Sequence, residues 1–214
     1  MQSDSGSPAR YRWQVKAILM LDRRATYADY LAVETASPTR HEFIDGVIVA
    51  MAGGSDEHNA ITNKLAAMCV LRVTGECRSY SPDQRFWIAS TARGRYSDGS
   101  IICGQPEHPA HDHQATTNPR VVFEVLSPSS EGDDEGEKRL DFQSLETLEA
   151  YVVVAQDARF VRVYRREGPS RGWRALADVY RDGDRFELPG LSAPIEVAEI
   201  YDGILDAAGR SLLR

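Results

Sequence analysis

The sequence lacks the features that identify several large classes of protein. No apolar run approaches the length of a membrane span, and the weak run at residues 17–21 is too short and too mixed for a signal peptide. The phosphate-binding GxxxxGK, the dinucleotide-binding GxGxxG, the zinc-binding HExxH and the nucleophile motif GxSxG are also absent. The sequence therefore does not predict a member of the common nucleotide-binding, zinc-protease or serine-hydrolase classes.

Cysteine and positive charge are scarce as well. The three cysteines, Cys69, Cys77 and Cys103, are odd in number and show no CxxC spacing. They predict buried thiols in a reducing, cytoplasmic compartment, and neither a disulfide framework nor a zinc site.

The formal net charge of −7 argues against nonspecific binding of nucleic acid through a basic surface. It still allows an enzyme whose contacts with phosphate are few and bridged by a metal ion.

The composition that is present is typical of a globular α/β protein. A chain of 214 residues with 42% apolar and 27% charged residues can bury a core without disulfides. The polar, Ser-, Gly- and Pro-containing start predicts a partly disordered N-terminal tail over residues 1–22. No repeat or linker divides the rest, so residues 23–214 are predicted to form a single domain.

Local patterns predict several helices and hairpins before the middle of the chain. Thr26 is a candidate cap for a helix to residue 35, and Asp45-Gly46 between two apolar runs predicts a hairpin turn. Ser55 or Asp56 is a candidate start for an amphipathic helix that runs to about residue 73. Residues 91–95 are predicted to form a loop. The later predictions are a helix that carries Lys138, a short helix at residues 145–150, a hairpin of residues 151–155 and 160–164, and a terminal helix at residues 198–205.

The stretch at residues 119–129 is predicted to be the central strand. It contains an apolar, β-branched run between Pro119 and Pro128, a pattern typical of a strand buried on both faces. Glu124 lies in the middle of this run. An ionised carboxylate in an apolar strand costs several kcal/mol or more unless something offsets its charge. Glu124 is therefore either paired with a cation or directed into a cleft or at a metal ion.

A second acid, Asp98, lies at the start of another short apolar strand. If that strand pairs with the central one, the carboxylates of Asp98 and Glu124 can point into the same cleft. Two oxygen ligands with open positions suit Mg²⁺, which supports phosphodiester hydrolysis, and a nearby ammonium could orient the attacking water. Asp98-Gly99 is also typical of a turn, so a purely structural role for Asp98 stays open.

The order of the short motifs resembles the Uma2 family of endonucleases in the PD-(D/E)XK, restriction-endonuclease-like superfamily. The resemblance covers about residues 27–203. Its main motifs are HEFIDG at residues 41–46, YSD at 96–98, FEVLSPS at 123–129 and DEGEK at 134–138. The resemblance implies an α/β fold with a restriction-endonuclease-like mixed sheet, flanking helices and additional hairpins. It also implies a divalent metal ion at the open end of the sheet.

The resemblance assigns roles to individual residues. Asp98 and Glu124 match the two metal-binding acids of the family motif, and the carbonyl of Val125 would be a third, backbone ligand. Glu42 matches an acid beside the site that could hold a water or a second metal ion. His58 matches a family position at a helix start, without a role that the residue type alone explains.

Two departures from the motif affect the prediction. The proline expected before the first acid is Ser97, which leaves the ligand intact, but the lysine expected two residues after Glu124 is Leu126. An apolar side chain cannot orient a nucleophile, and the resemblance implies that Lys138 from the following helix takes this place.

The sequence thus predicts an endonuclease that depends on Mg²⁺ or Mn²⁺ and hydrolyses phosphodiester bonds, with DNA favoured as its substrate. Asp98, Glu124, Lys138 and Glu42 are the candidate catalytic residues. A homodimer is expected by analogy with endonucleases that cut both strands. The alternative is an inactive nuclease-fold protein that serves as a nucleic-acid-binding or interaction module. The acidic net charge and Leu126 favour that alternative, whereas the retained carboxylate pair favours the enzyme.

Overall fold

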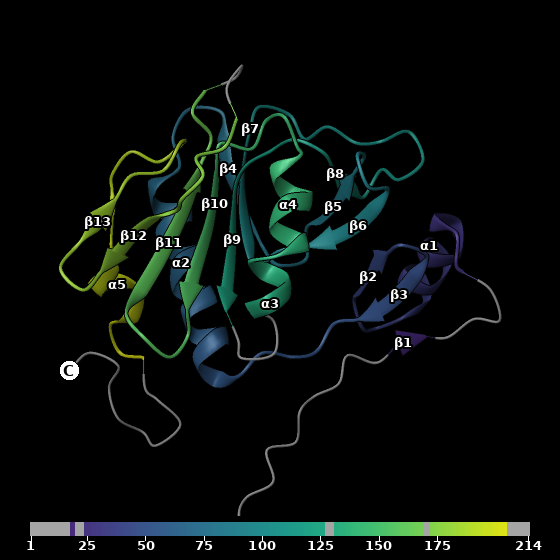
Figure 1. The fold of residues 1–214 in the computed structure, drawn as a ribbon, viewed down its shortest axis with the longest axis horizontal. Helices are drawn as coiled ribbons and strands as arrows, with labels where there is room; N and C mark the ends of the chain where they lie inside the picture. Colours follow the sequence, from purple (N-terminus) through teal and green to yellow (C-terminus); the bar gives the residue numbers. More distant parts are fainter. Residues whose placement is uncertain (1–17, 20–23, 127–130, 169–171, 205–214) are drawn as a thin grey trace, which may run out of the picture.

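A computed structural model describes residues 18–19, 24–126, 131–168 and 172–204 of the chain (Figure 1). Most of the predicted tail over residues 1–22 lies outside these ranges. Its described part, β1 (Ile18–Leu19), pairs antiparallel with the hairpin that follows, so these two residues belong to a sheet. The single domain over residues 23–214 stays a prediction.

The described residues form two six-stranded sheets and one pair of short strands. The N-terminal sheet has the strand order β1-β3-β2-β6-β5-β8, and the central sheet has the order β12-β11-β10-β9-β7-β4. The other strands of the N-terminal sheet are β2 (His41–Ile44), β3 (Val47–Ala50), β5 (Arg85–Ile88), β6 (Arg93–Tyr96) and β8 (Ala115–Thr116). The strands of the central sheet are β4 (Cys77–Tyr80), β7 (Gly99–Cys103), β9 (Pro119–Leu126), β10 (Ala150–Ala155), β11 (Phe160–Arg165) and β12 (Asp178–Arg181), and the short pair is β13 (Arg185–Phe186) with β14 (Ile195–Glu196).

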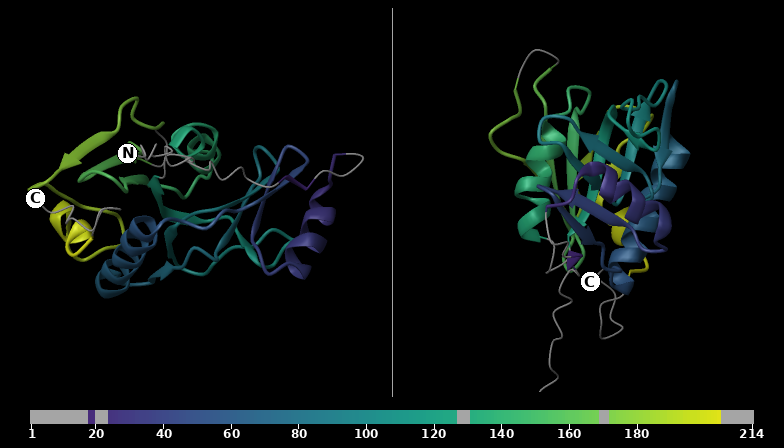
Figure 2. Two further views of the ribbon diagram at one scale, coloured as in Figure 1. Left: turned by 90° about the horizontal axis from the view of Figure 1, so that it is seen from below. Right: turned by 90° about the vertical axis from the view of Figure 1, so that its right-hand side faces the viewer.

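Helices cover both faces of the central sheet. The helices in the described ranges are α1 (Tyr27–Ala36), α2 (Asp56–Arg72), α3 (Glu131–Asp134), α4 (Glu137–Gln143) and α5 (Val197–Tyr201). The side chains of α2 and α5 pack on one face of the sheet, and α4 packs on the other. The N-terminal sheet and α1 lie at one end of the long axis of the molecule, and β13 and α5 lie at the other (Figure 2). This arrangement confirms the predicted α/β class with mixed sheets, because β9 is parallel to β10 and antiparallel to β7.

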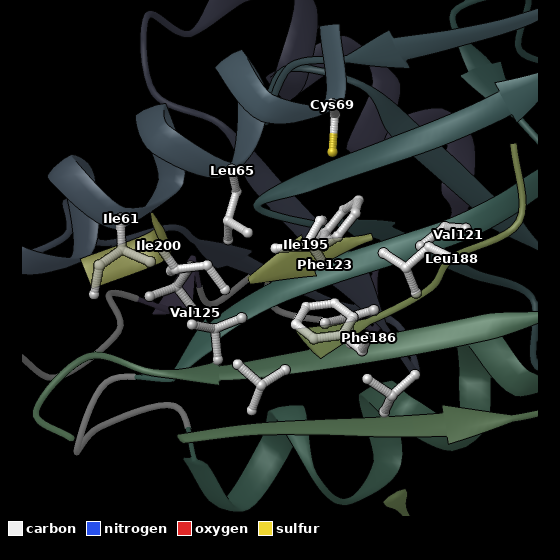
Figure 3. Close-up of a cluster of buried hydrophobic side chains, with 14 of the residues drawn as sticks. Ile61, Leu65, Cys69, Val121, Phe123, Val125, Phe186, Leu188, Ile195 and Ile200 are labelled. Carbon is white, nitrogen blue, oxygen red and sulfur yellow. The ribbon is translucent and has the colours of Figure 1, made fainter. Parts of the chain in front are cut away.

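Strand β9 is buried on both faces, as its apolar run predicts. Val121, Phe123 and Val125 point toward α2, where they pack with Ile61 and Leu65 (Figure 3). The alternate residues Val122 and Leu126 pack on the opposite face with Phe142 of α4. Because side chains alternate along a strand, Glu124 shares the face of Val122 and Leu126 and is directed toward α3 and α4.

The local signals for α1, the first hairpin and α2 are confirmed. Thr26 caps α1 in a reciprocal capping box with Asp29, and Ser55 caps α2 by accepting the His58 backbone N–H. The hairpin between β2 and β3 turns at Asp45 and Gly46, both of which have positive φ angles (51° and 81°). Two positive φ angles are the requirement of the tight turn that matches the twist of paired strands, which explains the Asp-Gly sequence.

Two predicted elements are wrong. Residues 93–95 of the predicted loop belong to β6, and residues 145–149 form a bend, a turn and irregular chain that lead into β10 instead of a second helix. The arginines of β6 suggest exposure, yet Arg93 and Arg95 are buried because carboxylates from other segments surround them. The apolar residues Leu145 and Leu148 pack under the sheet from turns, so their spacing is not that of a helix.

The prediction of three free thiols is also wrong. Cys77 and Cys103 lie opposite each other in the antiparallel pair β4–β7 and form a disulfide, while Cys69 is a buried free thiol. The pairing comes from the strand register, which the cysteine spacing does not reveal. The prediction of a reducing compartment was based on three free thiols, and the disulfide removes that basis. Within the described ranges, no helix combines the length and apolar composition that crossing a bilayer requires.

A buried ion pair holds the N-terminal sheet to the loop before β8. Arg85 donates from Nε and Nη2 to the two carboxylate oxygens of Asp112, each at 2.9 Å, and the Tyr27 hydroxyl donates to Asp112 at 2.8 Å. Burial is the largest single influence and would raise the pKa of Asp112, but the hydrogen bonds from Arg85, Tyr27 and the Gln114 backbone, with the charge of Arg85, together lower that pKa below its usual range.

We expect Asp112→Asn to destabilise the protein by about 3–5 kcal/mol at pH 7, because Arg85 is left buried without its counterion. A carboxyl whose pKa is lowered by folding stabilises the fold above its unfolded pKa near 4, and this contribution disappears as the pH falls through the folded value. Urea unfolding from pH 7 downward should therefore show the difference between wild type and variant shrinking below about pH 4. Asp83→Asn, at a carboxylate that is 79% exposed, is the matched control with little expected effect. A difference that stays constant with pH would contradict the assignment.

Candidate active site

Asp98 lies where the chain passes from one sheet to the other. Strand β6 ends at Tyr96 in the N-terminal sheet, and β7 starts at Gly99 in the central sheet. Gly99 pairs with Phe123 of β9, and the Asp98 backbone N–H donates to the Phe123 carbonyl at 3.0 Å. The pairing on which the two-acid hypothesis depends is therefore present, and it places Asp98 beside the strand that carries Glu124.

Two N–H groups bind one oxygen of the Asp98 carboxylate. Oδ2 accepts from the Val125 backbone N–H at 2.7 Å and from Nε2 of His58 at 3.1 Å. Burial by itself would raise the pKa of Asp98, but the hydrogen bond and charge of His58, the charge of Lys138 and the Val125 backbone N–H together lower that pKa below its usual range. Asp98 is thus held as an anion, with its side chain still 19% exposed.

Glu124 is almost completely buried, and its two oxygens differ. Oε2 accepts a hydrogen bond from Nζ of Lys138 at 2.9 Å. Oε1 is buried and accepts none from the residues that the structure describes. Burial raises the pKa of Glu124 well above its usual range, and the Lys138 ammonium opposes that rise. A buried carboxylate oxygen without a partner is costly, and a bound ion or water is one explanation for it.

Lys138 reaches this cluster from the first turn of α4. Its ammonium lies 2.9 Å from Glu124, 3.3 Å from Oδ1 of Asp134 and 4.0 Å from Oε1 of Glu42. Burial alone would lower the pKa of Lys138, but the charges of Glu124 and Asp134 outweigh it and raise the pKa well above its usual range. Lys138 is therefore a protonated cation surrounded by three carboxylates. The structure brings it to Glu124, as required of a residue that replaces the lysine missing at Leu126.

Glu42 joins the cluster from β2 and is itself held by β6. Its Oε2 accepts from Nη1 of Arg95 at 3.2 Å, and its Oε1 accepts from the Tyr96 backbone N–H at 3.2 Å. Arg95 is fully buried and also donates from Nε to Asp141 at 2.8 Å. Both oxygens of Glu42 thus face protein donors, with Lys138 next to Oε1. Glu42 is therefore better placed to hold the Lys138 ammonium than to bind a metal ion directly.

Sequence reasoning missed Asp134, Asp141 and Arg95. The acidic run that contains Asp134 resembles a solvated loop, although its spacing of four residues from Lys138 is that of a helical ion pair. Asp141 follows Lys138 by three residues and therefore lies on the same side of α4. Nothing in the local sequence around Arg95 indicates its burial, because its partners come from β2 and α4.

The donors in this cluster fit a hard divalent cation. Asp98 and Glu124 offer carboxylate oxygens, and Oε1 of Glu124 is buried without a hydrogen-bond donor among the described residues. In the same ranges, no three His, Cys, Asp or Glu side chains converge as a metal-binding group. Two carboxylates with open positions are a donor set that Mg²⁺ can accept, since Mg²⁺ needs only one or two carboxylates and keeps several waters.

Comparison with known proteins identifies the family. Residues 27–198 match the family Uma2, described as "Putative restriction endonuclease". The chain belongs to the Uma2 family. This Uma2 protein is 32% identical over 172 residues to the uncharacterized protein sll1609 of Synechocystis sp., covering 80% of this chain and 91% of the relative. It is 30% identical over 177 residues to the uncharacterized protein slr1290 of the same organism, covering 82% of this chain and 90% of the relative.

The fold of this Uma2 protein also resembles a solved structure. A crystal structure of a putative nuclease belonging to DUF820 from Anabaena variabilis superimposes with a TM-score of 0.63 and 15% sequence identity. The alignment covers 79% of this chain and 93% of that one. At this identity the likeness concerns the fold, which agrees with the α/β, mixed-sheet architecture predicted from the sequence.

Proposed function

We propose that this Uma2 protein is an endonuclease that hydrolyses phosphodiester bonds with the help of Mg²⁺ or Mn²⁺, and that DNA is its substrate. The observation that carries the proposal is the buried Glu124 carboxylate, which lies beside Asp98 and has one oxygen on the Lys138 ammonium and the other without a donor in the described residues. The family description supports the reaction class. A homodimer, expected of enzymes that cut both strands, stays a prediction.

In this proposal Asp98, Glu124 and the carbonyl of Val125 would hold the divalent cation. When bound, the cation would act as a Lewis acid that polarises the phosphate and lowers the pKa of a water molecule. Asp98 contributes because His58 and Val125 keep it anionic and leave its other oxygen available. Glu124 contributes its oxygen Oε1 and uses Oε2 to fix the lysine.

Lys138 orients the attacking water and stabilises the charge that develops on the phosphate. Its raised pKa keeps it protonated, so it donates hydrogen bonds and does not act as a base. Glu42 lies 4.0 Å from the ammonium and helps to hold it, while Arg95 and the Tyr96 backbone N–H fix both oxygens of Glu42.

Cleavage of plasmid DNA and single-stranded DNA in the presence of Mn²⁺ tests the proposal. We expect wild type to cut and Glu124→Gln to show only background cleavage, because the amide lacks the negative charge and presents a donor to Lys138. Glu187→Gln, at an exposed residue, is the matched control and should cut like wild type. Wild type and Glu124→Gln cutting at equal rates would place the chemistry elsewhere.

The alternative, an inactive nuclease-fold protein that binds nucleic acid or a protein partner, is favoured by the net charge of −7 and by Leu126. Metal binding separates the two proposals. An enzyme that binds Mn²⁺ only when folded should gain thermal stability in millimolar Mn²⁺, whereas an inactive binding module should not. A wild type that shows no stabilisation and no cleavage of DNA or RNA would favour the alternative.

A further inference from the structure

His58 is fixed by its position in the first turn of α2. Its backbone N–H donates to the Ser55 hydroxyl at 3.2 Å, which caps the helix and sets the direction of the following side chain. The imidazole is 16% exposed and points from α2 to Asp98, 40 residues further along the chain. A histidine at a helix start is usually solvated, so this contact calls for a specific role.

The contact with His58 decides which oxygen of Asp98 is occupied. A carboxylate can rotate about its Cβ–Cγ bond and exchange its two oxygens. Here Oδ2 accepts from two directions, from Nε2 of His58 and from the backbone of Val125, and the two donors together fix that rotation. Among the described residues no hydrogen bond involves Oδ1, which is therefore the oxygen presented to the site.

Gly54 leaves the space that the His58 imidazole occupies. A Cβ atom at Gly54 would lie 2.5 Å from Nδ1 and 2.9 Å from Cγ of His58, closer than real Cβ contacts allow, so the ring packs directly against the glycine backbone. A Cβ at the neighbouring Gly53 would meet no atom within 4 Å. Neither glycine has a positive φ angle, so the difference between them is steric. Gly54 is thus the residue that makes room for the ring.

We propose that His58 and Gly54 are positioning residues for Asp98: Gly54 seats the imidazole, and its Nε2–H holds Oδ2 so that Oδ1 faces the metal ion. This inference rests on the proposed nuclease function and extends it to the residues behind the ligand. Donors of this kind orient the ligands of metal sites, and their loss weakens metal affinity or activity by about 10–100-fold.

Two substitutions of His58 separate positioning from proton transfer. Glutamine places an amide N–H near the position of Nε2 but cannot exchange a proton at neutral pH, whereas leucine has no donor. Calorimetric titration of each full-length variant with Mn²⁺ alone should give near-wild-type affinity for His58→Gln and about 10–100-fold weaker affinity for His58→Leu. In DNA cleavage at fixed Mn²⁺ below saturation, His58→Leu should lose kcat while KM for DNA stays constant.

The two glycines provide a second, independent test. Gly54→Ala should displace the imidazole and weaken Mn²⁺ binding in the direction of His58→Leu. Gly53→Ala, the matched control in the same loop, should bind Mn²⁺ like wild type. Thermal unfolding of every variant shows whether it is folded. If His58→Leu does not fold, the comparison of Gly54→Ala with Gly53→Ala decides the question.

The outcomes distinguish this inference from the proposed function. A wild type that binds no Mn²⁺ overturns both. A wild type that binds Mn²⁺ and cuts DNA, with His58→Leu or Gly54→Ala equal to it in Mn²⁺ affinity, overturns only the positioning role. If His58→Gln keeps full Mn²⁺ affinity but loses cleavage, positioning is overturned as the whole role of His58, and proton transfer is added to it.

Discussion

Replacing Lys138 by methionine should remove both cleavage and a large part of the stability. Methionine keeps the length of the side chain but not the ammonium, so Glu124, Asp134 and Glu42 are left around an apolar group. Removing one partner from a buried ionic group costs about 3–5 kcal/mol. In a chain of this size, that corresponds to a fall in melting temperature of roughly 6–20 °C.

The effect of Lys138→Met on cleavage has a separate cause. Loss of a group that stabilises developing charge lowers kcat by about 10²–10³-fold. Measurement of cleavage well below the melting temperature of the variant separates this loss from unfolding. Lys64→Met is the matched control, because Lys64 is 37% exposed and its partner Asp202 is 74% exposed. A Lys138→Met protein with wild-type stability and activity would show that the ammonium is not part of the site.

The second large effect is expected for Arg95→Met. Arg95 is fully buried and bridges Glu42 on β2 and Asp141 on α4, so its loss leaves two buried carboxylates with fewer donors. We expect the free energy of unfolding to fall by about 3–5 kcal/mol. Because Asp141 is one helical turn from Lys138, the variant should also cut more slowly even where it is folded.

A double-mutant cycle tests the origin of this loss. If the cost of Arg95→Met comes from the uncompensated carboxylate of Glu42, then Glu42→Leu should cost less in the Arg95→Met protein than in wild type. The coupling energy expected for such neighbours is about 0.5–3 kcal/mol, measured by urea unfolding. Arg185→Met is the control, since Arg185 is 70% exposed and its partner Glu196 is 4.0 Å away. Strictly additive costs would mean that Arg95 acts through packing alone.

Features set by neighbouring residues could be predicted from the sequence. The Asp45-Gly46 turn, the cap of α2 at Ser55 and the apolar run of β9 each depend on a few adjacent residues, and all three were found where expected. The pairing of β7 with β9 was only a condition of the metal-site hypothesis, because local patterns do not determine which strands become neighbours. Glu124 was predicted to be a site residue because an ionised carboxylate is costly in an apolar strand. That cost does not depend on where the strand lies in the fold.

Features set by distant partners could not be predicted. Arg95 looks like a loop residue until Glu42 and Asp141 are placed beside it, and the disulfide of Cys77 with Cys103 depends on the register of two strands. His58 is similar, because its contact with Asp98 exists only once α2 lies across the end of the central sheet. Charge compensation and register are properties of the assembled fold, which explains why the local sequence did not indicate them.

The parallel pairing of β9 with β10 determines when the cluster can assemble during synthesis. Parallel neighbours need a connection that returns to the starting end of the sheet, and here that connection carries α3 and α4 with Lys138. A nascent chain that ends at β9 therefore contains Glu42, Asp98 and Glu124 but not yet their ammonium. In the finished fold the returning segment packs against β9 and β10 together, through Phe142 on Val122, Tyr151 and Val153. Unfinished chains that end at β9 thus carry the acidic side chains of the cluster without the Lys138 ammonium that binds them in the finished fold.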